Sequence, residues 1–308
     1  MHLIRGLPPA GSLKGGQALT VGAYDGLHLG HQALLARLRA HAKRLGVPTL
    51  MVTFEPMPRE FLSPANPPVR LTSLRERWRT LEQMQLDGLC VLRFGTAIRS
   101  LSADQFASLL AERLQPAVVV VGHDFRFGRD GQGTAETLAA AGQRLGFAVD
   151  IADPVTLEGE RVSSSAIREA LAATDLQHAA RLLGRPYTMI GRVVRGEQLG
   201  RKLGFPTANV RFPHRRLPVA GIFAVRLRIH GEKDALGGVA SIGTRPTVGG
   251  TEPLLEVYVF DFDGDLYGRE ISVECVQFLR AELKFESLDA MVAQIHADAA
   301  QARALLNI

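Results

Sequence analysis

The sequence predicts a two-domain α/β protein, in which a domain with a doubly wound parallel sheet precedes a small antiparallel β-barrel. Its 308 residues fit about two domains, each large enough to bury a core. Up to residue 183, apolar segments of strand length alternate with segments whose apolar residues recur at helical spacing, an order typical of parallel sheets. From residue 187 to residue 279, strand-like segments follow one another with only turns between them, which favours antiparallel pairing.

The expected strands of the first domain are short apolar segments at 18–21, 49–54, 89–94, 117–121 and 147–152. The fourth is a run of valines, typical of a strand buried on both faces of a sheet. Helices are expected in the intervals after Gly30, from Leu74, after an N-capping Ser102, and over 134–145. A helix between successive strands lets those strands lie parallel.

Gly184, Arg185 and Pro186 separate the last helical pattern from the next strand, so we expect an N-terminal domain of residues 1–183 and a C-terminal domain of residues 184–308. The expected strands of the second domain are 187–194, 221–229, 236–242, 254–262 and 270–279. The tail over 287–306 is an expected helix, because its apolar residues form one stripe.

Composition narrows the class of protein. The sequence contains no apolar run of the ~18–20 residues that a membrane helix needs, and its N-terminus lacks the apolar core of a secretory signal. Its 2 cysteines, Cys90 and Cys275, exclude a disulfide framework and a structural zinc site and suit the cytoplasm. The net charge is +5, but the basic residues are scattered among acids, which disfavours nucleic acid and fits small phosphate-bearing substrates.

The first expected strand ends in the segment 22–31, GAYDGLHLGH, where a helix begins. His28 and His31 are one helical turn apart, Gly30 permits close approach of a ligand, and a helix N-terminus offers free N–H groups. These groups suit the phosphates of ATP, because nucleotidyl transfer moves negative charge onto the leaving pyrophosphate. The same pattern also arises in ordinary core packing; its position at the carboxyl end of a parallel strand favours a ligand site.

A second phosphate-binding element is expected at Ser163-Ser164-Ser165, where another helix starts, with Arg168 one turn further on. The alternative is a plain serine N-cap. Two further loops, 53–58 (TFEPMP) and 122–128 (GHDFRFG), follow strands at the same edge of the sheet. Their phenylalanines either form the walls of a site for a flat aromatic ligand or belong to the core: Phe54, Phe125 and Phe127.

In the second domain the glycine-rich segment 196–209 contains cations and can wrap phosphates, although no P-loop motif occurs in the sequence. Thr207 and Asn209 are oxygen ligands two residues apart, as Mg²⁺ prefers. Glu256 interrupts an apolar strand and is either a general base for an alcohol attacking ATP or a residue on a half-exposed face. A Gly/Pro-rich turn capped by Thr207 and Asn209 is the structural alternative to the metal site.

The motifs of the first domain resemble the FMN adenylyltransferase half of the bacterial bifunctional riboflavin kinase/FMN adenylyltransferases, also called FAD synthetases, which carry GxFDGxHxGH, TFEPHP, GxDFxFG and SSSxIR in this order. The resemblance implies a Rossmann-like nucleotidyltransferase domain with His28 and His31 as catalytic residues. It implies ATP contacts at Gly22, Asp25, Gly30, Ser164, Ser165 and Arg168, and flavin contacts at Phe54, Pro56, Pro58, Asp124 and Phe125. Tyr24 stands where the family usually has Phe, and Met57 where it usually has His.

The second domain resembles the riboflavin kinase half of the same family, through GRxLGFPTAN, GIFAV, GVASIGTRPT, LEVYVFDFDGDLYG and FLRAELKF in series. The resemblance implies a six-stranded antiparallel β-barrel with a C-terminal helix. It implies that Thr207 and Asn209 bind Mg²⁺-ATP, that Glu256 is the catalytic base, and that Gly200 and Lys202 contact ATP.

The expected function is therefore phosphorylation of riboflavin to FMN by ATP and adenylylation of FMN to FAD, with Mg²⁺ at both sites. The expected partners are ATP, riboflavin and FMN, with apo-flavoproteins as FAD acceptors and neither nucleic acid nor membrane. One rival is a cytidylyltransferase or a synthetase-like HxGH enzyme, although no KMSKS-like loop is present. The other is a flavin carrier or an RNA-binding regulator without turnover.

Overall fold

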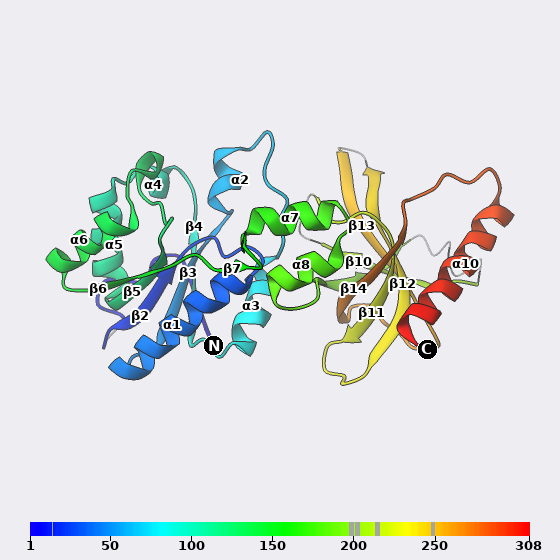
Figure 1. The fold of residues 1–308 in the computed structure, drawn as a ribbon, viewed down its shortest axis with the longest axis horizontal. Helices are drawn as coiled ribbons and strands as arrows, with labels where there is room; N and C mark the ends of the chain where they lie inside the picture. Colours follow the sequence, from blue (N-terminus) through cyan, green and yellow to red (C-terminus); the bar gives the residue numbers. More distant parts are fainter. Residues whose placement is uncertain (14, 197–199, 201–203, 213–215, 248–249) are drawn as a thin grey trace. The chain divides into compact units, whose positions relative to one another are not determined.

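The computed structural model describes the chain except for residues 14, 197–199, 201–203, 213–215 and 248–249 (Figure 1). Contacts divide the chain into two compact units. The first comprises Met1–Pro68 and Arg77–Val162, and the second comprises Val69–Glu76 and Ser163–Ile308.

The first unit is built on a sheet with the strand order β1-β4-β3-β2-β5-β6, in which all pairs are parallel. The strands are β1 (His2–Arg5), β2 (Gln17–Val21), β3 (Thr49–Glu55), β4 (Gly88–Arg93), β5 (Pro116–Gly122) and β6 (Ala148–Ala152). The five strand predictions for this domain are confirmed, and β1 is an additional strand that was not predicted. That edge strand has only four residues and is mostly exposed, so it carries little apolar signal.

The helices of this unit are α1 (Leu29–Leu45), α2 (Pro58–Leu62), α4 (Thr96–Arg99), α5 (Ala103–Leu114) and α6 (Ala135–Leu145), together with most of α3 (Leu74–Gln83). Helices lie on both faces of the sheet (Figure 1). Ser102 caps α5 as predicted: its hydroxyl accepts from Gln105 N (3.1 Å) while the Gln105 side chain accepts from Ser102 N (2.8 Å). Every residue of β2 is buried, as expected for a central strand covered on both sides.

The second unit contains a closed barrel with the strand order β10-β13-β12-β11-β14-β9 and only antiparallel pairs. The strands are β9 (Thr188–Val194), β10 (Thr207–Arg211), β11 (Gly221–Ile229), β12 (Ala235–Thr247), β13 (Gly250–Val259) and β14 (Glu270–Arg280). The predicted barrel and its C-terminal helix, α10 (Leu288–Leu306), are both confirmed. β10 was not among the strands that periodicity predicted, because it directly follows the glycine-rich segment.

The second unit also contains two helices that precede the barrel, α7 (Ser164–Ala172) and α8 (Leu176–Leu183). The short segment Val69–Glu76 belongs to this unit as well. The Glu76 carboxylate accepts from Ile190 N (2.6 Å), and Arg168 Nε donates to Val69 O (2.6 Å). The compact units divide at 162/163, because α7 and α8 pack with the barrel unit. The sequence pattern predicts a domain boundary at 183/184 instead.

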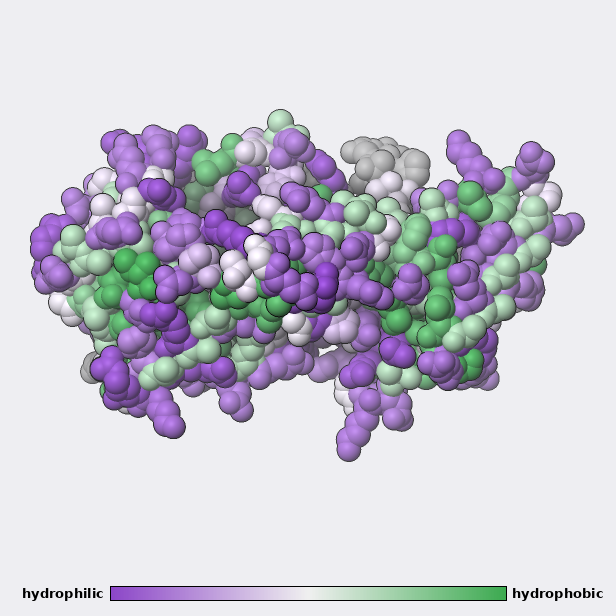
Figure 2. Space-filling view, in the orientation of Figure 1, coloured by the Kyte–Doolittle hydropathy of each residue, from purple (hydrophilic) through white to green (hydrophobic). Residues whose placement is uncertain are grey.

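The surface is mostly hydrophilic on the face drawn in Figure 2, with apolar residues in smaller groups between the charged ones. Within the described part of the chain, no helix has both the length and the apolar character needed to cross a membrane.

Candidate active sites

The carboxyl ends of β2 and β5 meet at the centre of the parallel sheet. From β2 the chain continues to β3 and then β4 on one side, whereas β5 pairs with the other side of β2. Neighbouring strands whose connections run in opposite directions open a crevice at their carboxyl ends, where ligands of such sheets bind. The two predicted motifs at 22–31 and 122–128 follow these two strands.

The loop between β2 and α1 is held in an uncommon conformation. Tyr24, Gly26 and Leu27 have φ values of 51°, 87° and 46°, all in the left-handed region. For two bulky side chains this region costs energy, and such strain persists only where the surroundings enforce it. Gly22 leaves room for the Tyr24 ring at the start of the loop, because a Cβ there would lie 3.0 Å from that ring, a tight contact.

The two predicted histidines lie side by side at the N-terminus of α1. His28 is the N-cap, and its Nδ1 accepts from His31 N at 3.4 Å. The two rings stack with centroids 3.7 Å apart and planes 20° from parallel. A Cβ on Gly30 would lie 3.2 Å from the His28 ring, so glycine also gives this stack its space. Two imidazoles and the N–H groups of a helix terminus are thus concentrated in one place.

Tyr24 packs against His31 of the histidine pair. Its ring meets the His31 ring edge-on with centroids 5.0 Å apart, and its hydroxyl hydrogen-bonds to Thr20 Oγ1. Thr20 Oγ1 in turn donates to Val120 O (2.7 Å) on β5. Burial raises the pKa of Tyr24 far above its ordinary value, so the phenol stays protonated. The sequence marked Tyr24 only as a replacement for Phe.

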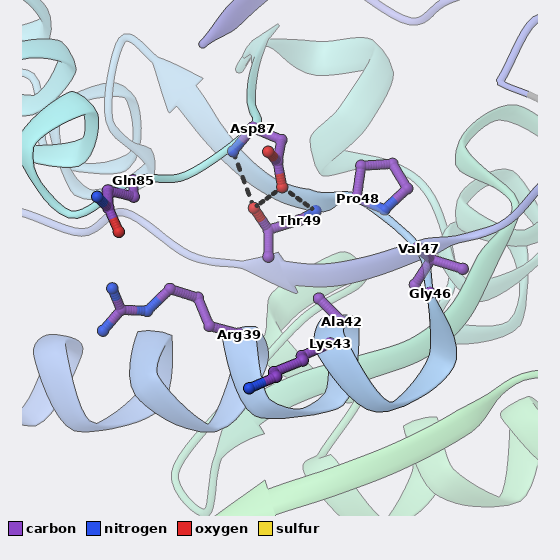
Figure 3. A pocket seen from close by; sticks show the side chains of 9 residues that line it. All are labelled: Arg39, Ala42, Lys43, Gly46, Val47, Pro48, Thr49, Gln85 and Asp87. Atoms are coloured by element: carbon purple, nitrogen blue, oxygen red, sulfur yellow. Dashed lines mark hydrogen bonds between the residues drawn. The ribbon is translucent and has the colours of Figure 1, made fainter.

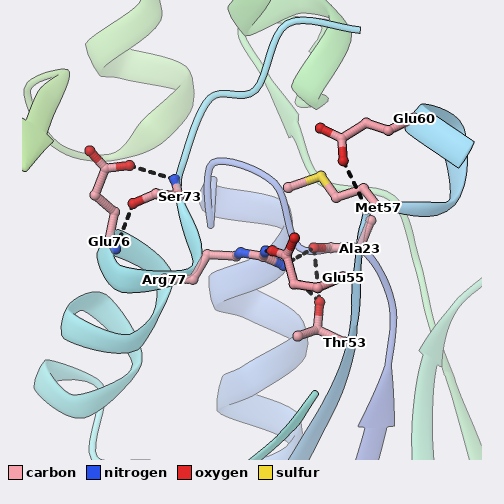
Figure 4. A network of polar contacts seen from close by, with 8 residues as sticks. All are labelled: Ala23, Thr53, Glu55, Met57, Glu60, Ser73, Glu76 and Arg77. Carbon is pink, nitrogen blue, oxygen red and sulfur yellow. Dashed lines mark hydrogen bonds and ion pairs between the residues drawn. The ribbon is translucent and has the colours of Figure 1, made fainter. Parts of the chain in front are cut away.

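Arg77 and Glu55 are two charged residues at this edge that the sequence analysis did not select. The Arg77 side chain is 0 % exposed and forms an ion pair with Glu55, the last residue of β3 (Figure 4). In a helix rich in charged residues, the only sequence signal for Arg77 is that it lies on the same helical stripe as Leu81. This position does not predict burial of the Arg77 side chain, which depends on tertiary contacts.

The proposed flavin contacts lie at the same edge but differ in exposure. Phe54 is 7 % exposed and packs edge-on against Phe94, so its ring belongs to the core. Phe125 is partly buried and stacks on Phe127 with centroids 5.4 Å apart. Asp124 is exposed and pairs with Arg161 (2.5 Å). In the remaining loop Pro56 is exposed, Pro58 begins α2, and Met57 between them is buried.

The serine motif forms the first turn of α7 in the second unit. Ser163 is the N-cap, with its hydroxyl accepting from Ala166 N (3.1 Å), which confirms the capping alternative for that one serine. Ser164 and Ser165 are the first two helical residues, half-buried and exposed respectively. Arg168 is half-buried on the next turn.

The barrel brings Thr207, Asn209 and Glu256 onto one outer face. Asn209 on β10 lies directly opposite Glu256 on β13, and Thr207 lies opposite Tyr258 in the neighbouring row. All three site residues are half-buried. Leu255 and Val257, which alternate with Glu256 along β13, are completely buried. The strand period therefore puts the polar groups on the outside of the barrel and the aliphatic groups in its core.

Two glycines of the segment 196–209, Gly196 and Gly200, lie close to this face. A Cβ on Gly196 would lie 2.5 Å from the Asn209 side-chain amide nitrogen. A Cβ on Gly200 would lie 2.4 Å from Phe205 O and 3.4 Å from Thr207 Oγ1. Gly200 is thus required by the close approach of Phe205 O, and at Gly196 the Asn209 side chain would have to move to admit a Cβ. Lys202, the predicted ATP contact of this segment, lies outside the described residues.

Elsewhere the described residues offer little chemistry. Burial raises the pKa of both Cys90 and Cys275 to about 12, so both thiols stay protonated. No group of three or more His, Cys, Asp or Glu side chains with metal-binding geometry is found within the described part of the chain.

A pocket of about 420 Å³ opens at the amino ends of β3 and β4, the edge opposite the histidines (Figure 3). Three of its polar residues have partners: the Asp87 carboxylate accepts from Thr49 N (2.9 Å) and from Thr49 Oγ1 (2.8 Å), and Arg39 Nη1 donates to Met84 O (2.9 Å). None of the residues that line this pocket is a predicted site residue.

Two family models match the chain. A model described as FAD synthetase matches residues 12–166, and a model described as riboflavin kinase matches residues 183–306. Two curated relatives, each called bifunctional riboflavin kinase/FMN adenylyltransferase, match at full length. The protein from Haemophilus influenzae is 42 % identical over 100 % of both chains. The protein from Pseudomonas fluorescens is 46 % identical over 99 % of this chain and 98 % of its own.

A solved structure from Streptococcus pneumoniae has the same arrangement of elements, with a TM-score of 0.81. It is 30 % identical and covers 98 % of this chain and 99 % of its own. That protein is described as a macrolide-efflux protein, a description that belongs to it alone.

Proposed function

The chain belongs to the family of bifunctional riboflavin kinases/FMN adenylyltransferases, and we propose how its own residues divide the two reactions. The enzyme converts riboflavin to FMN and FMN to FAD, with ATP as the second substrate of both steps. We assign adenylyl transfer to residues 1–183 and phosphorylation to residues 184–308.

In adenylyl transfer an oxygen of the FMN phosphate attacks the α-phosphorus of ATP, and the bond to the β-phosphate breaks to release pyrophosphate. Negative charge moves onto the leaving group, and no covalent enzyme intermediate is needed. His28, His31 and the N-terminus of α1 would stabilise that charge. The observation that carries this assignment is the stacked pair of imidazoles at the helix N-terminus, 3.7 Å apart.

Other residues complete the proposed adenylylation site. Gly22, Asp25 and Gly30 would line the ATP side of the crevice. For Ser164, Ser165 and Arg168, which belong to the second unit, the proposal of contact with ATP rests on the sequence motif alone. Pro56, Pro58, Asp124 and Phe125 would contact the flavin, with Phe54 supporting their loops from the core.

In the kinase reaction the terminal hydroxyl of riboflavin attacks the γ-phosphorus of ATP, and the bond from that phosphorus to the β–γ bridging oxygen breaks to release ADP. Glu256 would take the proton of that hydroxyl as the bond to phosphorus forms. Its support is a half-buried carboxylate on the same barrel face as Thr207 and Asn209. Gly200 lies close to that face and Lys202 follows it in the sequence; we assign both to the ATP phosphates.

The kinase face also fits Mg²⁺. Its donors are the hydroxyl of Thr207 and the amide oxygen of Asn209, the oxygen ligands that this ion takes together with phosphate and water. When bound, the ion would neutralise developing charge on the transferred phosphate. We propose Mg²⁺-ATP as the true substrate, apo-flavoproteins as acceptors of FAD, and the cytoplasm, whose reducing conditions suit the two buried thiols, as the location.

One experiment tests the assignment as a whole. The protein is incubated with riboflavin and Mg²⁺-ATP, and the flavins are separated by chromatography. We expect FMN first and FAD after it. Omitting Mg²⁺ should abolish both products, and added FMN with CTP in place of ATP should give no flavin dinucleotide. Formation of flavin cytidine dinucleotide from CTP as readily as FAD from ATP would contradict the assignment.

A further inference from the structure

Arg77 is a buried cation next to the proposed adenylylation site. Its side chain is 0 % exposed, although Arg75 and Glu82 on the same helix are exposed. A buried cation is tolerated only where charged and polar partners replace the water that it loses. The identity of those partners shows what the residue does.

The partners of Arg77 come from the ends of two adjacent strands. Its Nη1 donates to Ala23 O (2.9 Å), in the loop after β2, and to Thr53 Oγ1 (2.8 Å) on β3. Its Nη2 donates to the Glu55 carboxylate. Thr53 Oγ1 also donates to Ala23 O (3.2 Å), so Arg77, Thr53 and Ala23 form a closed set of contacts (Figure 4).

These contacts fix two loops at once. Ala23 directly precedes Tyr24, the first left-handed residue of the turn that leads to His28. Glu55 directly precedes Pro56, in the loop proposed to contact the flavin. A planar guanidinium with several donors can hold both loops in one geometry, whereas a single ammonium cannot.

Arg77 also balances a charge. The Glu55 side chain is 26 % exposed at the edge where the ATP phosphates would lie. A carboxylate there without its cation would repel those phosphates. The repulsion would be strong because the site is only partly open to solvent.

We propose that Arg77 is a positioning residue for FMN adenylylation: it joins the histidine loop to the end of β3 and neutralises Glu55 beside the ATP phosphates. The proposal rests on the proposed assignment of this edge as the adenylylation site. It concerns the FAD-forming reaction alone, so the kinase reaction of the same molecule serves as an internal standard.

The test compares four variants of the full-length protein: Arg77→Met, Arg77→Lys, Arg77→Met with Glu55→Gln, and the control Arg79→Met. Arg79 lies on the same helix but is 34 % exposed, and its Nη1 lies 3.5 Å from the Glu82 carboxylate. kcat and KM for ATP are measured for FAD formation from FMN, and each rate is divided by the rate of FMN formation from riboflavin.

For Arg77→Met we expect the normalised kcat to fall by about 100-fold, because small displacements of reacting groups cost about that much, and KM for ATP to rise. Adding Glu55→Gln should return KM to within about threefold of wild type while kcat stays low, since repulsion is removed but the link between loops is not restored. Arg77→Lys should keep KM near wild type with a reduced kcat, and Arg79→Met should change neither.

Three results would overturn the proposal. One is an unchanged kcat and KM in Arg77→Met. Another is an equal loss of both reactions in Arg77→Met and Arg77→Lys, which would reduce Arg77 to a folding role. The third is a failure of Glu55→Gln to lower the raised KM. A variant with His28→Ala and His31→Ala is measured alongside. If this variant and Arg77→Met both keep wild-type FAD formation, the assignment of this edge as the adenylylation site is wrong. If the histidine variant loses FAD formation while Arg77→Met does not, only the role of Arg77 is refuted.

Discussion

Asn209 and Glu256 lie directly opposite each other on the paired strands β10 and β13. Directly opposed residues of an antiparallel pair have their Cβ atoms about 4.5–5.5 Å apart on one face. A proposed ligand of the metal and the proposed base are thus held together by the barrel itself. They are separated by 47 positions in the chain, so only the closure of the barrel explains their proximity.

The contact between the glycine-rich segment and Asn209 predicts the effect of a single methyl group. Gly196→Ala would place a Cβ 2.5 Å from the Asn209 amide, and either that side chain or the segment must move. We expect FMN formation to fall at least about tenfold, because small misplacements of positioned groups carry large costs. FAD formation from added FMN should be unchanged. Gly95→Ala, with nothing within 4 Å of its new Cβ, is the matched control; equal kinase rates in both variants would refute the prediction.

The histidine pair predicts the opposite separation of activities. Replacing His28 and His31 by Ala should lower FAD formation by about 10²–10³-fold per lost stabilising donor and leave FMN formation intact. His41→Ala is a suitable control, because His41 lies on the same helix but pairs with Asp150 (2.9 Å). Rates are measured for each reaction with its own substrate. Wild-type FAD formation in the double variant would show that the pair is structural.

Tyr24 allows ring and hydroxyl to be tested separately. Tyr24→Phe keeps the edge-on contact with His31 and removes only the bond to Thr20, whose Oγ1 still donates to Val120 O. We expect a loss of about 1 kcal/mol in the free energy of unfolding and nearly unchanged FAD formation. Tyr24→Leu should lower FAD formation as well, because the His31 ring loses its support. Chemical denaturation and the adenylylation rate measure the two effects, and a normal rate in Tyr24→Leu would contradict the role of the ring.

Contacts within the second unit predict how the barrel behaves alone. A fragment of residues 184–308 retains every barrel strand and α10, so we expect it to fold and form FMN. It lacks Glu76, whose carboxylate accepts from Ile190 N (2.6 Å), and it lacks the Arg75 partner of Glu270. Loss of a charged acceptor typically costs about 1.5–3 kcal/mol, so the fragment should unfold at a lower denaturant concentration than the barrel of the full chain. A folded fragment without kinase activity would show that Val69–Glu76 or α7–α8 is needed for catalysis.

Long, regular elements were predictable from the sequence because one physical rule decides them. The valine run of β5 is typical of a strand buried on both faces. Ser102 caps α5 through a hydrogen bond to Gln105, only three residues further along the chain. β1 and β10 were not predicted, since the first is a short exposed edge and the second begins at Thr207 directly after a glycine-rich turn.

The candidate sites divide in the same way. Motif residues such as His28 and Glu256 carry their chemistry in the local sequence and were selected from it. Arg77 was not, because its burial and its contacts with Ala23 and Glu55 arise only when α3 packs under two loops. The division of compact units at Val162 likewise depends on tertiary contacts, such as that between Glu76 and Ile190, that no local pattern records.

The most direct test of the account is the rate of FMN formation by Glu256→Gln under saturating Mg²⁺-ATP and riboflavin, with FAD formation from added FMN measured on the same sample. Glutamine keeps the shape of the side chain and removes its basicity, so we expect FMN formation to fall by about 10²–10⁴-fold while FAD formation continues at the wild-type rate. Glu274→Gln on β14, where Glu274 lies 4.0 Å from Arg226, is the matched control and should leave both rates unchanged. FMN formation at the wild-type rate in Glu256→Gln would contradict the role of Glu256 as the base of the kinase reaction.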